Sequence, residues 1–287
     1  MGWAASVSPP ASSHTAVAHL RSVTLAAIPP GADQRFPFSV PIIGQLGTLN
    51  LDTALTFLVG ENGSGKSTLL EAVAASAGLP TVGSDSIGAD TTLAAQRVLA
   101  DALSLVWNRR TRRGFFLRAE DFFGFTKALS KLRAELLERL TEIDGEYEHR
   151  SAWAKGLAKG PVMASLGDME RRYGINLDEA SHGQSFLTLF QARFVPGGLY
   201  LLDEPEAPLS PQSQLALMML MRDMIAQDAQ FIIATHSPIL LGFPGARIYS
   251  CDETPLAEVK FADLDHVVIT RDFLNSPERF LRHMECG

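Results

Sequence analysis

Residues 55–70 read LTFLVGENGSGKSTLL, and this stretch decides how the rest of the chain is interpreted. Its middle fits the phosphate-binding pattern G-x-x-x-x-G-K-[ST], which runs here from Gly60 to Ser67. An apolar run of strand length, residues 55–59, comes before the loop, and good helix formers follow it over residues 67–76. A glycine loop between a strand and a helix directs backbone N–H groups and the positive end of the helix toward phosphate oxygens. The stretch therefore predicts a site for a nucleoside triphosphate.

The side chains of this loop have separate expected tasks. Lys66 should reach the β- and γ-phosphates and take part in catalysis, and the Ser67 hydroxyl should bind Mg²⁺. The glycines have no Cβ, so the backbone can turn tightly around the phosphates. The residues expected to contact the nucleotide are Gly60, Asn62, Gly63, Ser64, Gly65, Lys66, Ser67 and Thr68.

The composition of the 287-residue chain is that of an ordinary globular protein, with 46% hydrophobic and 20% charged residues. Its length suits one large or two modest domains. The net charge of −7 argues against a generally basic nucleic-acid-binding protein, although it leaves a local basic groove open. No apolar run approaches the roughly 20 residues that span a bilayer, so we expect no direct membrane insertion. Cys251 and Cys286 lie far apart without metal-type spacing, which favours a cytoplasmic location.

Before the phosphate loop, the chain is expected to hold a disordered leader, a strand and an extended segment. Residues 1–18 are rich in Ala, Ser and Pro, residues 21–27 alternate as a strand does, and residues 35–43 are interrupted by two prolines. The interrupted segment favours an edge strand or an extended arm. Within it, Phe36 or Phe38 could stack on adenine, and the alternative for both is packing in the core.

Residues 109–125 combine charged and aromatic side chains. The basic run RRTRR, residues 109–113, is either a solvated turn or a contact for phosphate or nucleic acid. The next stretch, GFFLRAEDFFGF, puts aromatic residues on both sides of Arg118 and Glu120. A buried charge is costly unless it is paired or bound to a ligand. Glu120 is therefore expected either to face the nucleotide or to pair with Arg118.

Hydrophobic periodicity predicts several helices after the phosphate loop. Residues 127–155 form one amphipathic stretch, too short for a long coiled-coil arm, and residues 156–174 look like an irregular connection. Ser181 is a good N-cap for a later helix. The remaining expected helices cover residues 91–106, 179–194, 211–227 and 271–284, and the remaining short strands cover residues 246–251 and 256–261.

Polar residues end two apolar runs in the second half of the chain. Residues 198–205 (GLYLLDEP) end in Asp203 and Glu204, and residues 230–238 (QFIIATHSP) contain His236 near their end. Such runs are typical of strands buried on both faces of a parallel sheet, which binds ligands at the carboxyl ends of its strands. Asp203 is expected to hold Mg²⁺, and Glu204 to polarise an attacking water. His236 is expected beside the γ-phosphate in the same crevice.

Together, these segments resemble the ATP-binding-cassette (ABC) superfamily of ATPases. Residues 180–184 (ASHGQ) look like that family's Leu-Ser-Gly-Gly-Gln signature: Ser181, Gly183 and Gln184 match, and His182 replaces the first glycine. The phosphate loop, the signature, the acidic strand and the histidine also follow in the family's order. The segments FLRAEDFF, SHGQSFL, YLLDEPEAPLSP and FIIATHSPILL look most like small stand-alone bacterial ATPases. Those proteins are similar in outline to ABC ATPases of DNA repair, recombination and phage defence.

The resemblance also implies how the site is completed. In the family, the signature of a second chain binds the same γ-phosphate, which implies an ATP-dependent homodimer with Ser181, Gly183 and Gln184 acting across the interface. Two positions depart from the family pattern. Ser210 stands where the family's D-loop has an aspartate, and Glu120 stands about where its Q-loop has a glutamine.

The fold implied by the resemblance is an α/β phosphate-loop NTPase. It would have a mostly parallel sheet flanked by helices, a small antiparallel β part, and a helical insertion over about residues 91–180 of a domain spanning residues 19–287. The implied activity is hydrolysis of ATP with Mg²⁺, as a switch acting on a protein or nucleic-acid partner. The alternatives are the nucleotide-binding subunit of a membrane transporter and a slowly hydrolysing regulatory module.

Overall fold

The computed structural model of the protein describes residues 18–82, 94–173 and 182–282. In the order in which they lie in the main sheet, the strands are β5 (Gly114–Arg118), β6 (Leu199–Asp203), β7 (Gln230–Ala234), β3 (Leu55–Val59), β8 (Arg247–Ser250) and β9 (Ala257–Glu258). Neighbouring strands run parallel from β5 to β8, and β9 pairs antiparallel with β8. The strands β3, β6 and β7 are buried at every position, as expected for the centre of a sheet covered on both faces.

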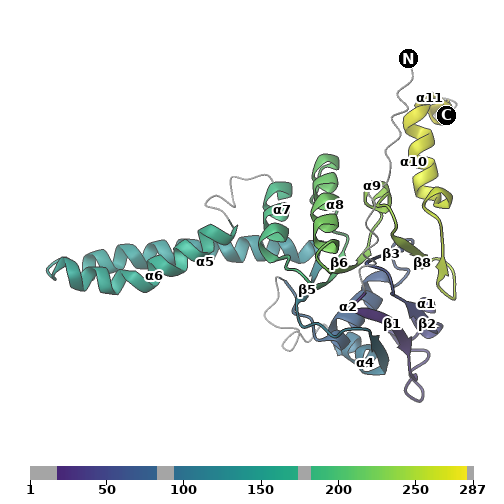
Figure 1. The fold of residues 1–287 in the computed structure, drawn as a ribbon, viewed down its shortest axis with the longest axis horizontal. Coiled ribbons are helices and arrows are strands. Elements are labelled where there is room, and N and C mark those ends of the chain that lie inside the picture. The colour runs from purple at the N-terminus through teal and green to yellow at the C-terminus, as the bar shows by residue number, and fades with distance from the viewer. Residues whose placement is uncertain (1–17, 83–93, 174–181, 283–287) are drawn as a thin grey trace.

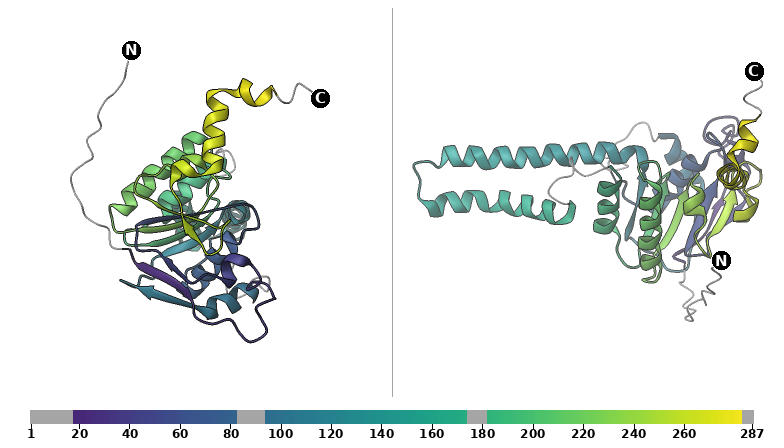
Figure 2. Two further views of the ribbon diagram at one scale, coloured as in Figure 1. Left: turned by 90° about the vertical axis from the view of Figure 1, so that its right-hand side faces the viewer. Right: turned by 90° about the horizontal axis from the view of Figure 1, so that it is seen from above.

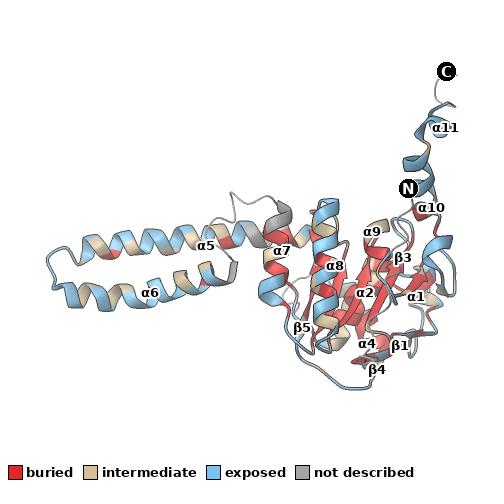
Figure 3. Ribbon diagram, turned by 45° about the horizontal axis from the view of Figure 1, so that its top comes forward, coloured by how far each residue is buried: buried red, intermediate tan, exposed pale blue. Residues whose placement is uncertain are grey.

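Helices cover both faces of this sheet (Figure 1). Side chains of β6 alternate between the two faces, as the period of two in a strand requires. Leu201 joins a core cluster with α2 (Lys66–Ala77), whereas Tyr200 joins another with α7 (His182–Arg193) and α8 (Pro211–Ile225). Figure 3 shows the buried strands between these helices. The mostly parallel α/β architecture that the sequence predicts is confirmed.

A second, antiparallel sheet packs on the α2 side of the main sheet. Its strands lie in the order β2 (Thr48–Asn50), β1 (Leu20–Leu25) and β4 (Leu103–Trp107), and the helices α1 (Pro41–Gly44) and α4 (Ala94–Ala102) accompany it. Leu20 and Val23 of β1 belong to the same core cluster as Leu69 of α2. The small antiparallel β part is thus present.

Two predictions in this region are wrong. Residues 35–43, all of which the structure describes, form turns and then α1 instead of an extended strand. Pro41 begins α1, where the fixed φ of proline suits the first turn of a helix. The helix expected over residues 91–106 ends at Ala102, because Leu103 and Leu105 pair with β1 as part of β4.

Gln230, the first residue of β7, joins the two sheets. Its buried side-chain amide accepts the N–H of Leu20 at 2.8 Å. The same amide donates to the carbonyl oxygens of Leu20 and Leu51 at 2.9 and 2.7 Å. Buried polar groups are stable where their hydrogen bonds are made in this way. The network fixes β1, and with it the antiparallel sheet, against the start of a central strand.

A two-helix arm projects from the body of the molecule next to β5 (Figures 1 and 2). Its helices, α5 (Ala119–Glu146) with 28 residues and α6 (Ala152–Tyr173) with 22, lie side by side in opposite directions. At 1.5 Å per residue, α5 is about 42 Å long. Figure 3 shows that most of the arm is exposed. Ion pairs between the two helices join Arg133 to Glu170, and Asp144 to both Lys155 and Lys159.

The arm differs from the helices that the sequence predicts. Residues 147–151 interrupt the single stretch expected over residues 127–155, and residues 156–173 are helical instead of irregular. Three glycines and Pro161 make α6 a poor helix by propensity, and its pairing with α5 overrides that tendency. The range 91–180, expected as a helical insertion, also contains β4 and β5. The helical arm itself begins at Ala119.

The end of the chain forms short elements around the last strands. These are α9 (Pro238–Leu241), the 3₁₀ helix η2 (Phe261–Asp263), α10 (Asp265–Asn275) and α11 (Pro277–Leu281). The helix expected over residues 271–284 starts earlier, at Asp265, and is interrupted at Ser276 because proline follows. The strand expected over residues 256–261 is reduced to β9.

In the described ranges, no helix is long and apolar enough to cross a membrane. Of the leader expected over residues 1–18, all but Ala18 lies outside the described residues.

Candidate nucleotide site

The phosphate loop, residues 60–67, connects the end of β3 to the start of α2, as the sequence predicts. Gly63 and Gly65 have φ values of 84° and 99°, in the region that favours glycine. A Cβ on Gly65 would lie 2.6 Å from Cγ1 of Val40. The loop therefore packs too closely on the segment before α1 to accept a side chain at Gly65.

Lys66 folds back into the phosphate loop and is buried. Its Nζ donates hydrogen bonds to the carbonyl oxygens of Gly60 and Glu61 at 2.6 and 2.8 Å, and to Oγ of Ser64 at 3.4 Å. These partners are uncharged, and an ammonium group binds more strongly to an oxygen that carries negative charge. A phosphate entering the loop would offer Lys66 such a partner.

A hollow of about 410 Å³ lies over the phosphate loop. Phe36 lines it and is 55% exposed, whereas Phe38 is buried in the core. Of the two aromatic candidates, only Phe36 therefore lies where a base could stack. The loop residues that line the same hollow are Asn62, Gly63, Gly65, Lys66, Ser67 and Thr68.

Asp203, the last residue of β6, lies next to Ser67 at the start of α2. Ser67 and the Asp203 carboxylate line the same cavity, and Oδ1 of Asp203 is buried without a hydrogen-bond partner among the described residues. Burial raises the pKa of Asp203 to about 6, and the nearby Ser67 hydroxyl acts in the opposite direction. A buried carboxylate oxygen beside a hydroxyl is a set of oxygen ligands that suits Mg²⁺. The two residues thus fit the metal that the sequence predicts.

Glu204 and His236 approach each other at the ends of β6 and β7. Oε1 of Glu204 lies 3.7 Å from Nε2 of His236, and the two side chains are 46% and 38% exposed. Glu204 has a φ of 49°, a conformation that is costly for a residue with a side chain and is often found at functional sites. Glu61 and Asn62 of the phosphate loop line the same open hollow. A carboxylate and an imidazole thus share a hollow with the loop.

Glu206 is a partly buried carboxylate that the sequence analysis missed. Its Oε1 accepts the backbone N–H of His236 at 2.7 Å, and burial raises its pKa. Glu206 therefore holds the turn that carries His236. The signal was present in the sequence, because Glu206 is the third acid of the run DEPE that begins at Asp203.

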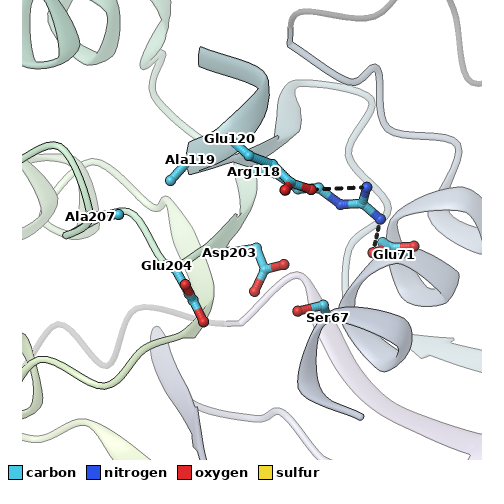
Figure 4. Close-up of a pocket in the computed structure, with 8 residues that line it drawn as sticks. All are labelled: Ser67, Glu71, Arg118, Ala119, Glu120, Asp203, Glu204 and Ala207. Carbon is cyan, nitrogen blue, oxygen red and sulfur yellow. Dashed lines mark ion pairs between the residues drawn. The ribbon is translucent and has the colours of Figure 1, made fainter. Parts of the chain in front are cut away.

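Arg118 and Glu120 line a separate cavity of about 460 Å³, which Ser67 and Asp203 also line (Figure 4). Arg118 forms an ion pair with Glu71 of α2, a partner that the sequence analysis missed. Glu120 lies 3.6 Å from the Arg118 guanidinium, and its side chain is 75% exposed. Glu120 is thus exposed instead of buried among the aromatic residues, and it lies both near Arg118 and at the wall of a cavity beside the phosphate loop. The missed signal was spacing: Glu71 follows Ser67 by four residues on one face of α2.

The predicted signature lies at the start of α7. Gly183 and Gln184 belong to the first turn of this helix, and the structure does not describe their side chains. Ser181 lies outside the described residues. At the departing D-loop position, the Ser210 hydroxyl accepts the N–H of Ser213 at 3.2 Å and caps α8.

The basic run 109–113 forms a largely exposed turn between β4 and β5. The Thr111 hydroxyl donates to the carbonyl oxygen of Gly197 at 2.9 Å, and Arg113 donates to that of Pro196 at 3.3 Å. These contacts hold the run against the turn before β6 and favour the solvated-turn interpretation.

Comparisons with known proteins agree with this arrangement. Residues 166–242 match the model of a family described as "AAA domain, putative AbiEii toxin, Type IV TA system". That range contains Asp203, Glu204 and His236. Over 210 residues, 72% of this chain, the sequence is 26% identical to the macrolide export ATP-binding/permease protein MacB of Agrobacterium fabrum. The matches support an ABC-type ATPase. The match to MacB covers only 30% of that protein's length.

Solved structures similar to this chain include an ATP-binding cassette of an ABC transporter and an Smc head domain. One is MJ1267, an ATP-binding cassette of an ABC transporter in its ADP conformation, with a TM-score of 0.44 and 16% identity. The similarity covers 88% of this chain and 98% of that chain. Another is the Smc head domain of Pyrococcus furiosus with an extended coiled coil, with a TM-score of 0.41 and 13% identity. There the similarity covers 83% of this chain and 95% of that chain.

Proposed function

We propose that the protein binds ATP with Mg²⁺ at the phosphate loop and hydrolyses it. The observation that carries this proposal is the cavity shared by Ser67 and Asp203, which brings the loop together with the acidic end of β6. Mg²⁺, when bound with ATP, neutralises phosphate charge, and these two residues would hold it. Lys66 would exchange the carbonyl oxygens of Gly60 and Glu61 for phosphate oxygens.

Glu204 is the proposed general base for the attacking water. It follows Asp203 directly, and its half-exposed carboxylate leaves room for a water between it and the nucleotide. His236 lies 3.7 Å from this carboxylate and would contact the γ-phosphate. Glu206 keeps the backbone of His236 in place. The four residues divide the work into metal binding, water activation, phosphate contact and positioning.

Phe36 is the proposed stacking partner of the adenine ring. It is exposed beside the phosphate loop, and an aromatic face of this kind binds a base without requiring a particular hydrogen-bond pattern. Phe38 supports the loop from the core instead.

Two chains are proposed to pair around the bound ATP. In the single chain, Glu204 and His236 remain open to solvent, and a second chain would cover them. The signature residues Ser181, Gly183 and Gln184 would come from that second chain, with the N-terminal end of its α7 directed at the phosphates. Glu120, at the wall of the neighbouring cavity, is a further proposed nucleotide contact.

ATP binding and hydrolysis would then act as a cytoplasmic switch on a protein or nucleic-acid partner. A second candidate function is the nucleotide-binding part of a membrane transporter. The similarity to MacB, whose name includes both an ATP-binding and a permease part, favours it. Co-purification with a membrane protein that stimulates ATP turnover would select this second candidate.

Phosphate release from ATP by the purified protein tests the proposed activity. We expect release with Mg²⁺, and none when EDTA removes the metal or when Lys66 is replaced by Ala. A protein that binds ATP but releases no phosphate under any of these conditions would leave binding intact and refute hydrolysis. Equal release by the wild type and Lys66→Ala would refute the site.

A further inference from the structure

Arg118 lies beside the candidate nucleotide site, but it has no role in the ATP hydrolysis proposed above. It is the last residue of β5 and pairs in register with Asp203 of β6. Neighbouring strands lie about 4.8 Å apart, so Arg118 stands beside the acidic residue that shares a cavity with Ser67. Its guanidinium crosses to α2 and forms an ion pair with Glu71 (Figure 4).

The pair between Arg118 and Glu71 is largely buried, with the Arg118 side chain 22% exposed, but it is incompletely bonded. Glu71 is only 7% exposed, and its Oε2 has no hydrogen-bond partner among the described residues. The same holds for Nε of Arg118. Removing two charges from water is compensated only where the remaining donors and acceptors are also bonded. The pair therefore has unused bonding capacity inside the cavity.

The place of Glu71 puts the guanidinium close to the phosphate loop. Glu71 and Ser67 are four residues apart on α2, so their side chains lie on one face, about one helical turn of 5.4 Å from each other. Ser67, Asp203 and Glu204 line the same cavity of about 460 Å³. A short movement of Arg118 along this wall would bring it from Glu71 to a group held by Ser67.

Charge indicates what Arg118 could bind there. The described residues that line the cavity include four carboxylates, and Arg118 is the single cationic side chain among them. The carboxylates can hold a metal ion or a water but repel phosphate. The planar guanidinium, with its fork of N–H donors, matches the oxygens of a phosphate.

We propose that Arg118 leaves Glu71 to bind the terminal phosphate of the nucleotide, so that the site distinguishes a triphosphate from a diphosphate. Glu71 is the resting partner, which keeps the guanidinium beside the loop and competes with the phosphate for it. This inference rests on the proposed ATP site and adds a residue that recognises its third phosphate.

Equilibrium binding of two nucleotides tests the exchange. ADP is compared with an ATP analogue whose β- and γ-phosphates are bridged by nitrogen, each with Mg²⁺, on the full chain. For Arg118→Gln we expect about tenfold or greater weakening for the analogue, since one charge-assisted contact is lost, with ADP affinity unchanged. For Glu71→Gln we expect tighter binding of the analogue, because the competing carboxylate is gone. In the double variant Arg118→Gln/Glu71→Gln this gain should be absent.

The pattern separates the exchange from a supporting role for the pair. Equal loss of both nucleotides in Arg118→Gln would make the pair a structural contact and overturn the inference. If Glu71→Gln tightens binding of the analogue equally with and without Arg118, the inference is also overturned. The gain would then come from removing a negative charge near the phosphates and not from releasing Arg118. If Arg118→Gln fails to fold, Glu71→Gln alone tests the exchange. An unchanged ratio of analogue affinity to ADP affinity in that variant would contradict it. Failure of the wild type to bind either nucleotide would refute the ATP site itself.

Discussion

Ser67 and Asp203 line one cavity, which brings the first turn of α2 together with the end of β6. The two residues are far apart in the sequence: Ser67 lies beyond the loop that follows β3, and Asp203 is the last residue of β6. Their meeting point lies between the phosphate loop and the acidic end of β6. Oδ1 of Asp203 is buried and has no hydrogen-bond partner among the described residues, so a cation bound there would offset the cost of burying its charge.

Asp203→Asn should stabilise the nucleotide-free protein at neutral and alkaline pH. Burial raises the pKa of Asp203 from 3.8 to about 6. Above pH 6 the carboxylate is charged in both states, and this charge is less favourable in the folded state than in the unfolded state. That difference is worth up to about 3 kcal/mol of unfolding free energy, which Asn would recover. As pH falls from about 7 to 4, the wild type takes up a proton and the difference should vanish.

Urea unfolding in EDTA at pH 8 and at pH 4 measures this effect, with Asp223→Asn, an exposed aspartate, as the control. An Asp203→Asn protein that is no more stable than the wild type at pH 8 would contradict the buried charge.

Gln230→Leu should weaken the attachment of the antiparallel sheet. The substitution keeps the side chain near its original size but leaves the N–H of Leu20 and three carbonyl oxygens without this partner. We expect a loss of about 2–4 kcal/mol in the free energy of unfolding. The exposed Gln227, changed to Leu, is the matched control, and it should cost much less. Similar losses for both variants would show that the network around Gln230 is not what holds β1.

Phe36→Ala should weaken binding of adenine nucleotides about 5- to 150-fold, the range of one lost stacking contact. Inorganic triphosphate has no base, so its affinity should stay the same, and Phe36→Tyr should restore nucleotide binding. Competition binding with both ligands distinguishes stacking from damage to the loop. An equal loss for ATP and inorganic triphosphate would assign Phe36 to the shape of the phosphate site instead.

Completion of the site by a second chain predicts complementation between two inactive variants. Lys66→Ala removes the phosphate contact of its own loop, and Ser181→Arg should block the signature that is offered to the partner. A mixed dimer would contain one site with both defects and one intact site, so part of the ATP turnover should return. Pull-down of differently tagged chains checks that mixed dimers form. If they form and stay as inactive as either parent, the assignment of Ser181 to the partner's site is contradicted.

The parts of this fold that could be predicted from the sequence are those with strict local patterns. The glycine loop, the apolar runs that became β6 and β7, and the acids at the end of β6 carry their structure in consecutive residues. Phosphate binding requires that spacing, so the residues of the candidate site could be predicted from the sequence. The residues that hold them in place could not.

The parts that could not be predicted depend on partners distant in the sequence. The helix α6 contains Pro161 and three glycines and is helical because α5 lies against it. Glu71 and Glu206 are functional candidates only through Arg118 and the backbone of His236, which reach them across the fold. The strand β4 likewise exists because β1 is beside it. The conformational propensities of neighbouring residues do not reveal these contacts.

Single-turnover hydrolysis of ATP by Glu204→Gln tests the central claim most directly. The variant keeps the phosphate loop, Asp203 and His236, so ATP and Mg²⁺ should bind within a few-fold of the wild-type affinity. Loss of the general base should slow cleavage about 10²–10⁴-fold and leave uncleaved ATP on the protein. Cleavage at the wild-type rate, with ATP bound as tightly as before, would contradict the assignment of water activation to Glu204 at the end of β6.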